Sequence, residues 1–194
     1  IYESAIKQGN LNKEEKKWFT DVLSKYFDVV KNTNTITRAK KMFEACVEQD
    51  NESKKFIPYT FDTLPELSVN YEQLYKLFLK RRSVRWYKDK DVPTTLIEKA
   101  INLAALAPSA CNRQPYYFYV SQSRKKAVEI ALCAGGTPGW ASGIPCTIAI
   151  IGDLSAYPRE RDRHLIYVDG SLASMQLMLA FETLGLSLIH ISEP

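Results

Sequence analysis

Three arginines and a serine fall within five residues of the sequence, in the stretch RRSVR at 81–85, called the arginine segment below. A guanidinium group carries a planar fork of donors that matches phosphate oxygens, and it does not deprotonate. Arg81, Ser83 and Arg85 alternate, so in extended backbone they share one face and could hold one phosphate, while Arg82 points the other way. A solvated basic surface is the alternative interpretation.

A second polar group lies in APSACNRQPYYFYV at 107–120, between a predicted helix and a predicted strand. Ser109, Asn112 and Gln114 offer donors and acceptors that suit the edge of a heterocycle, on backbone restrained by Pro108 and Pro115. Such loops often carry ligands. A turn that only connects two elements explains the same residues equally well.

Other chemistry is weakly indicated. The stretch GGTPGW at 135–140 lacks the Gly-Lys-Ser/Thr ending of a triphosphate-binding loop, and we expect a mobile loop that presents Trp140. His164 has no evident nucleophile, which argues against a hydrolytic triad. Asp153, Asp162 and Asp169 are too scattered to indicate a metal site.

Hydrophobic spacing predicts the elements that must position these residues. A helix capped by Asn12 and a second apolar pattern predict a helical hairpin with a tail in residues 1–70, ending in a linker. Residues 71–194 are predicted as a second domain of α+β class. Met175, Met178 and Leu179 are predicted to be core residues. Helices are expected from Tyr71 to the arginine segment and over 93–106, 123–134 and from about 163, with strands over 116–120 and 146–153.

Composition narrows the class of protein. The 194 residues carry a net charge of +4, and the whole excess lies in residues 71–194, four of its cations between Lys80 and Arg85. Such focused charge favours a small anionic ligand over nucleic acid. No apolar run could span a membrane, and the first residues lack the apolar stretch of a signal peptide, so we expect a cytoplasmic protein. The four cysteines are expected to be reduced thiols, without a metal.

Taken in order, four stretches resemble the FMN-dependent nitroreductase family over about residues 72–187. They are RRSVRWYKDKDVP, APSACNRQPYYFYV, GIPCTIAIIGD and YVDGSLASMQLMLAFETLGL. The resemblance implies a nitroreductase-like α+β fold, with a central, mostly antiparallel sheet flanked by helices. Residues 1–70 are similar to a helical N-terminal extension found in some bacterial members.

The resemblance also implies a cofactor site for FMN. Residues of the arginine segment would lie near the phosphate and ribityl chain, with Arg85 toward the ring, where its charge favours reduced flavin. Loop residues would line the flavin, partly from the second subunit of a homodimer. The implied site residues are Arg81, Arg82, Ser83, Arg85, Pro108, Ser109, Ala110, Asn112 and Gln114.

The implied activity needs no catalytic side chain. NADH or NADPH would reduce the flavin, and a nitroaromatic, quinone or similar small acceptor would then reoxidise it in ping-pong order. The alternative is a catalytically silent, truncated flavin-domain protein that binds partners through its helical N-terminal segment. A nucleic-acid binder is not favoured, because no recognition motif is present.

Two departures from the family pattern stand out. Tyr116 occupies a position where the family usually has Trp. After Ser187 the sequence reads LIHISEP, which has no family counterpart. We therefore expect roughly the last third of the family domain to be absent, and the tail to be non-native.

Overall fold

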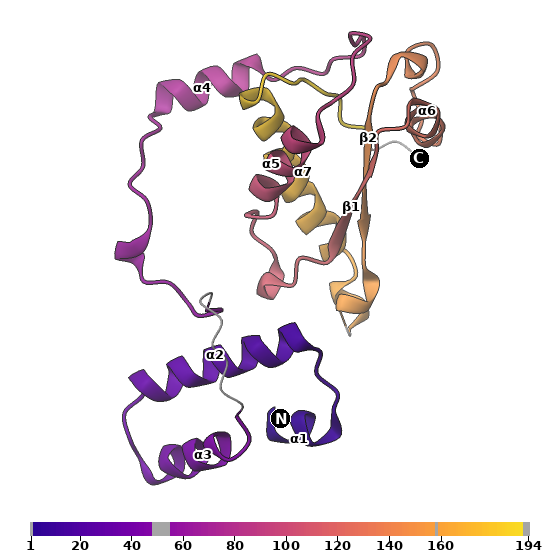
Figure 1. The fold of residues 1–194 in the computed structure, drawn as a ribbon. Helices are drawn as coiled ribbons and strands as arrows, with labels where there is room; N and C mark the ends of the chain where they lie inside the picture. Colours follow the sequence, from indigo (N-terminus) through magenta and orange to yellow (C-terminus); the bar gives the residue numbers. More distant parts are fainter. Residues whose placement is uncertain (1, 48–54, 158, 192–194) are drawn as a thin grey trace. The chain divides into compact units, whose positions relative to one another are not determined.

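The computed structural model describes residues 2–47, 55–157 and 159–191. The chain divides into two compact units, residues 1–67 and 68–194. Figure 1 traces the elements of each unit. No helix among the described residues is both long and apolar enough to cross a bilayer.

The first unit is a cluster of helices around three aromatic rings. Helix α1 spans Tyr2–Gln8, α2 spans Lys13–Val29 and α3 spans Asn34–Glu44. Tyr2, Phe27 and Phe43 are buried together, one from each helix. The predicted cap is confirmed: Asn12 and Glu15 form a capping box at the start of α2. The two helices of the expected hairpin are found as α2 and α3, and α1 is a third helix that the sequence did not predict.

A buried ion pair ties the segment after α3 to α2. The Lys17 ammonium lies 3.0 Å from the Asp21 carboxylate, and both side chains are almost fully buried. Asp21 also accepts a 2.8 Å hydrogen bond from the Phe56 amide and lies 3.4 Å from the Lys55 ammonium. These contacts satisfy a carboxylate that would otherwise be costly to bury.

The second unit holds four α-helices among its described residues. Asn70 and Gln73 form the predicted cap of α4, and Arg81 terminates that helix, as the sequence indicated. Their bounds are Tyr71–Lys80 for α4, Thr94–Ala104 for α5, Arg124–Ala131 for α6 and Leu165–Thr183 for α7. Single 3-10 turns occur at Phe61–Thr63 in the first unit and at Ala110–Asn112, Ala141–Gly143, Leu154–Ala156 and Glu160–Asp162 in the second.

Two strands form an antiparallel sheet in the second unit. Strand β1 covers Tyr116–Ser121 and β2 covers Thr147–Gly152, with Tyr116 opposite Gly152. Phe118 and Ile150 face each other and pack toward the helices, whereas Tyr117 is more than half exposed on the opposite face. Helices combined with an antiparallel sheet confirm the predicted α+β class.

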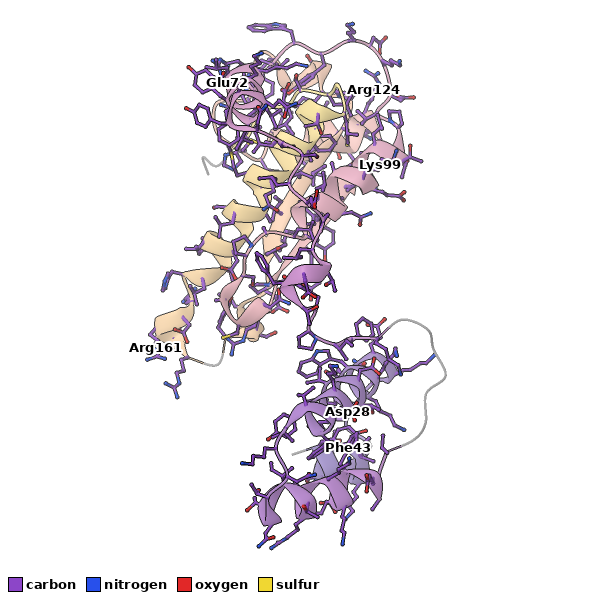
Figure 2. All side chains as sticks on the ribbon, turned by 90° about the vertical axis from the view of Figure 1, so that its left-hand side faces the viewer. Asp28, Phe43, Glu72, Lys99, Arg124 and Arg161 are labelled. Carbon is purple, nitrogen blue, oxygen red and sulfur yellow. The ribbon has the colours of Figure 1, made fainter. Side chains whose placement is uncertain are left out.

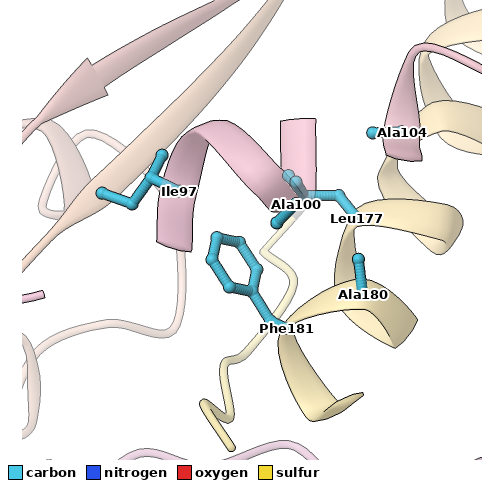
Figure 3. Packing of buried hydrophobic residues seen from close by; sticks show 6 residues of the cluster. All are labelled: Ile97, Ala100, Ala104, Leu177, Ala180 and Phe181. Carbon is cyan, nitrogen blue, oxygen red and sulfur yellow. The ribbon is translucent and has the colours of Figure 1, made fainter. Parts of the chain in front are cut away.

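The core of the second unit lies between α5 and α7. Ala100 and Ala104 on α5 are fully buried, as is Ala173 on α7, so the helix backbones approach closely. Figure 3 shows the Phe181 ring of α7 beneath Ala100. Phe118 and Ile148 of the sheet pack against the same cluster. This packing fixes α5 and α7 as the frame for the loops at their ends.

Two sequence expectations fail here. Trp140 is not presented by a mobile loop: it packs against the Ala127–Ile144 cluster, and its indole Nε1 donates 2.9 Å to the Gly136 carbonyl. The preceding Thr137 is fully buried. Met175 is 40% exposed and so is not core. Neither outcome was readable from local pattern, because both depend on which neighbours the tertiary fold supplies.

Candidate functional site

The arginine segment begins where α4 ends. Arg81 is the C-cap residue, in extended backbone, and it is half-buried. The Arg82 guanidinium turns back, and its Nη1 donates 2.8 Å to the Arg81 carbonyl and 3.4 Å to that of Phe78. Those carbonyls carry the negative end of the helix dipole. Arg82 therefore caps α4.

Arg81 and Arg85 differ from Arg82. Among the described residues no carboxylate forms an ion pair with either of them. Ser83 and Arg85 are exposed, and Val84 between them is half-buried. The Tyr87 hydroxyl donates 2.6 Å to the Val84 carbonyl, which anchors the segment to its own continuation. The outer side of the segment thus offers cations and a hydroxyl to an anion.

The second predicted group forms a tight loop, residues 109–114, called the 109–114 loop below. Cys111, Asn112 and Gln114 have φ values of 53°, 51° and 48°, in the left-handed region that glycine favours. Each such residue costs about 1 kcal/mol or more relative to right-handed backbone. A loop with three of them needs strong contacts to hold it.

Asp169 of α7 supplies those contacts from a buried position, with 3% of its surface exposed. Its Oδ2 accepts hydrogen bonds from Ser109 Oγ at 2.7 Å, from the Ala110 amide at 3.0 Å and from the Tyr157 hydroxyl at 3.0 Å. Burial, together with the Asp169 carboxylate, raises the pKa of Tyr157, so this hydroxyl stays protonated and donates. Hydrogen bonds to an ionised acceptor contribute about 1.5–3 kcal/mol each.

Further bonds close the loop on itself. The Gln114 amide donates 2.8 Å to Ser109 Oγ, and Gln114 Nε2 donates 2.8 Å to the Ala105 carbonyl at the end of α5. Pro108 is exposed, and Ala110 is half-buried. The Asn112 side chain is exposed and makes no hydrogen bond to any described residue. Asn112 is therefore the loop amide that is available to a ligand.

Sequence reasoning missed Asp169 and Tyr157 as part of this loop. Asp169 was considered only as a metal ligand, and its partners lie 60 and 59 residues away in the chain. One signal was present: a carboxylate within the apolar run of α7 must be exposed or satisfied. That signal says that a partner exists without saying which residue it is.

The two groups do not meet within one chain. The arginine segment precedes α5 and the 109–114 loop follows it, and Figure 1 shows them at opposite ends of that helix. An α5 of 11 residues separates them by about 16 Å along its axis. A hollow in the second unit lies along β2 and α7, and none of the nine predicted cofactor residues lines it.

The geometry defines a class of protein: an α+β domain with a cationic segment at one end of a core helix and a rigid polar loop at the other. Residues 78–136 match the Nitroreductase family. A putative NADH dehydrogenase/NAD(P)H nitroreductase of Archaeoglobus fulgidus is 32% identical over 123 residues, which are 62% of this chain and 67% of that protein. The chain belongs to the nitroreductase family.

Other relatives agree with this placement. An iodotyrosine deiodinase 1 of Mus musculus is 30% identical over 117 residues, 59% of this chain and 41% of the mouse protein. Among solved structures, an FMN-dependent nitroreductase from Clostridium difficile R20291 aligns with a TM-score of 0.51 and 28% identity, over 57% of this chain and 61% of its own. The nitroreductase-like fold is thereby confirmed, and the chain spans between two fifths and two thirds of these relatives.

Proposed function

We propose that this chain is part of an FMN-dependent oxidoreductase that takes electrons from NADH or NADPH. One observation carries the proposal: Arg81 and Arg85 flank the exposed Ser83 hydroxyl, and neither guanidinium is paired with a described carboxylate. A dianionic phosphate is a ligand that this donor set fits. Family membership makes FMN the phosphate-bearing cofactor of choice.

The residues have separate roles in this proposal. Arg81 and Ser83 hold the phosphate end by charge and hydrogen bonding, and Arg85 lies toward the ring, while Arg82 keeps α4 capped behind them. The exposed Asn112 amide meets the polar edge of the ring system from the 109–114 loop. When bound, FMN would supply the redox chemistry between NADH or NADPH and a nitroaromatic, quinone or similar acceptor, in ping-pong order. No side chain is required as an acid or base.

The site is completed by a second copy of the chain, because α5 holds its two halves apart in one chain. The outer face of α7 supports a homodimer, since Val168, Leu172 and Met175 lie on one stripe and are 40–46% exposed. We expect Leu172→Glu to shift the chain to monomer in sedimentation experiments and to lose FMN binding with it. If the unmutated chain is a monomer and still binds FMN, the proposal that two copies share the site is contradicted.

Titration of FMN by quenching of its fluorescence tests the cofactor. The full chain should quench it saturably. Arg85→Ala should weaken binding about tenfold or more, as expected for loss of a charge-assisted bond. Lys99→Ala is the matched control, because Lys99 projects from the exposed side of α5 (Figure 2) and should leave affinity unchanged. Equal affinities for both variants, or no binding by the unmutated chain, would refute the assignment.

A second candidate function is partner binding through the first unit without flavin chemistry. It is favoured by exposed large apolar side chains on that unit, notably Trp18, Tyr26 and Met42 at 44–49% exposure. Deleting residues 1–60 separates the candidates. The oxidoreductase keeps FMN binding by the remaining unit, whereas the interaction protein loses its self-association and shows no flavin binding before or after deletion.

A further inference from the structure

The carboxylate of Asp169 gathers donors from two separate parts of the chain onto one oxygen. Ser109 Oγ and the Ala110 amide come from the 109–114 loop, and the Tyr157 hydroxyl comes from the segment before α7. All three bonds are 2.7–3.0 Å long, and both Asp169 and Tyr157 are buried. This carboxylate is therefore shielded from water by the groups that it holds.

A second contact reaches the other side of the loop through the same tyrosine. The Arg113 guanidinium carbon lies 5.2 Å from the centre of the Tyr157 ring, within cation–π range. Tyr157 thus contacts Arg113 with its ring while its hydroxyl donates to Asp169. The loop is held at Ser109 and Ala110 directly, and at Arg113 indirectly.

The residues that flank the loop pack on the same helix, one turn further along. Ala107 and Tyr116 are buried against Ala173 of α7, which is four residues after Asp169. The residues that flank the loop are therefore fixed to α7 by packing, and its first two residues, Ser109 and Ala110, are fixed to α7 by Asp169. Without that acceptor, the loop keeps the bond from Gln114 Nε2 to the Ala105 carbonyl, but it loses both bonds that hold Ser109 and Ala110, the residues that precede the left-handed Cys111 and Asn112.

We propose that Asp169 is a positioning residue: by accepting three hydrogen bonds it holds the 109–114 loop in the left-handed conformation in which Asn112 meets the cofactor. Only the second half of this inference, that Asn112 meets the cofactor, rests on the proposed flavin function. The hold on the loop stands on the contacts of this chain, and the use of the loop by FMN stands on the proposed function.

Asp169→Asn in the full chain tests both halves. The carboxamide is nearly isosteric and its oxygen can take the place of Oδ2, but it carries no charge, so the three hydrogen bonds that Asp169 Oδ2 accepts become weaker. Hydrogen exchange of the peptide covering 108–116 should become about tenfold faster, because the Ala110 amide loses a charge-assisted bond. The FMN dissociation constant should rise by a similar factor, while exchange in α5 and α7 stays as it was.

Two further variants calibrate the result. Asp153→Asn is the matched control, because Asp153 also accepts from a hydroxyl and an amide, those of Ser155, but in its own turn. It should leave hydrogen exchange of the 108–116 peptide and FMN affinity unchanged.

Tyr157→Phe removes one donor and keeps the ring over Arg113, so it should give a smaller acceleration of exchange in the same peptide. This variant replaces Asp169→Asn in the test if Asp169→Asn does not fold.

Each outcome of these measurements either supports or overturns the positioning role of Asp169. Faster exchange confined to 108–116 together with weaker FMN binding supports the proposal. Unchanged exchange there overturns the positioning role, whatever the flavin result. Acceleration spread equally over α5 and α7 also overturns it, because Asp169 is then only a stabilising residue of the core. If the unmutated chain binds no FMN, the proposed function fails and so does the second half, while the exchange data still decide the first.

Discussion

The Val84 amide donates a hydrogen bond of 3.2 Å to the Leu188 carbonyl, which joins the arginine segment to the chain that follows α7. Leu188 is itself half-buried against the α5–α7 core, next to Leu186. Leu188 thus supports the segment proposed to hold phosphate.

Removing residues 188–194 should therefore loosen the arginine segment. We expect faster hydrogen exchange at Val84 and a free energy of unfolding lower by about 1–2 kcal/mol, because Leu188 is half-buried against the core. Chemical denaturation and exchange measurements check both. Removing only 192–194 is the control, because it keeps Leu188. Equal stability of the two deletions would show that the tail contributes nothing.

Gly152 at the end of β2 should not tolerate a side chain. A Cβ there would lie 2.8 Å from Ile166 Cβ, which cannot move without shifting α7. Gly152→Ala should lower the free energy of unfolding by about 1–3 kcal/mol. Gly143→Ala meets no atom within 4 Å and should change stability by less than about 1 kcal/mol. If the urea midpoints of Gly152→Ala and Gly143→Ala decrease by the same amount, the close approach of β2 and α7 is contradicted.

The α5–α7 contact should dominate the stability of the second unit. Ile97 is 2% exposed in its centre, whereas Leu103 on the same helix is 49% exposed. Ile97→Ala should cost about 2–5 kcal/mol in the free energy of unfolding, and Leu103→Ala less than about 1 kcal/mol. Similar losses in calorimetric stability for both variants would mean that α5 does not pack as described.

The buried carboxylate of the first unit predicts a pH dependence. Burial alone would raise the pKa of Asp21, but the Phe56 amide and the Lys17 and Lys55 ammonium groups outweigh it, so the pKa lies below its ordinary value of 3.8. An acid with a lowered folded-state pKa stabilises the fold above its unfolded pKa and loses that effect as pH falls through the folded one. Stability should therefore hold above about pH 4 and decline below it.

Asp21→Asn isolates this effect. The variant should be less stable at pH 7 by about 3 kcal/mol, since it removes the buried carboxylate that pairs with the buried Lys17 ammonium. The difference should shrink as pH drops below 4. Asp28→Asn is the control on the same helix, because Asp28 is exposed (Figure 2). Thermal unfolding at a series of pH values measures the stability difference between the unmutated chain and Asp21→Asn. A difference that stays constant down to pH 2 would rule out the lowered pKa of Asp21.

Much of the fold could be predicted from local sequence signals. Caps at Asn12 and Asn70 lie next to the helices that they start, so sequence alone placed α2 and α4 within a residue or two. The α1 helix has only Tyr2 and Ile6 to mark its apolar side, which is too short a pattern to be recognised. Trp140 and Met175 were misplaced because composition does not say which face of an element a neighbour covers.

Part of the candidate site could also be predicted from the sequence, and part could not. Arg81, Ser83 and Arg85 were predicted as a group because their spacing is local, and the structure shows their charge to be unpaired among the described carboxylates. The hold of Asp169 on Ser109 was not predictable, because it spans 60 residues and depends on how α7 packs beside the loop. Long-range hydrogen bonds follow from tertiary packing, which no short window of sequence contains.

The length of α5 has a kinetic consequence. Because this rigid 11-residue helix keeps the two half-sites of a chain apart, a complete proposed site arises only when two chains meet. Specific activity should then fall on dilution, and the amount of working enzyme should scale with the square of chain concentration below the dissociation constant of the pair. Mixing a chain damaged at Arg85 with one damaged at Asn112 should restore one working site of the two in each mixed pair.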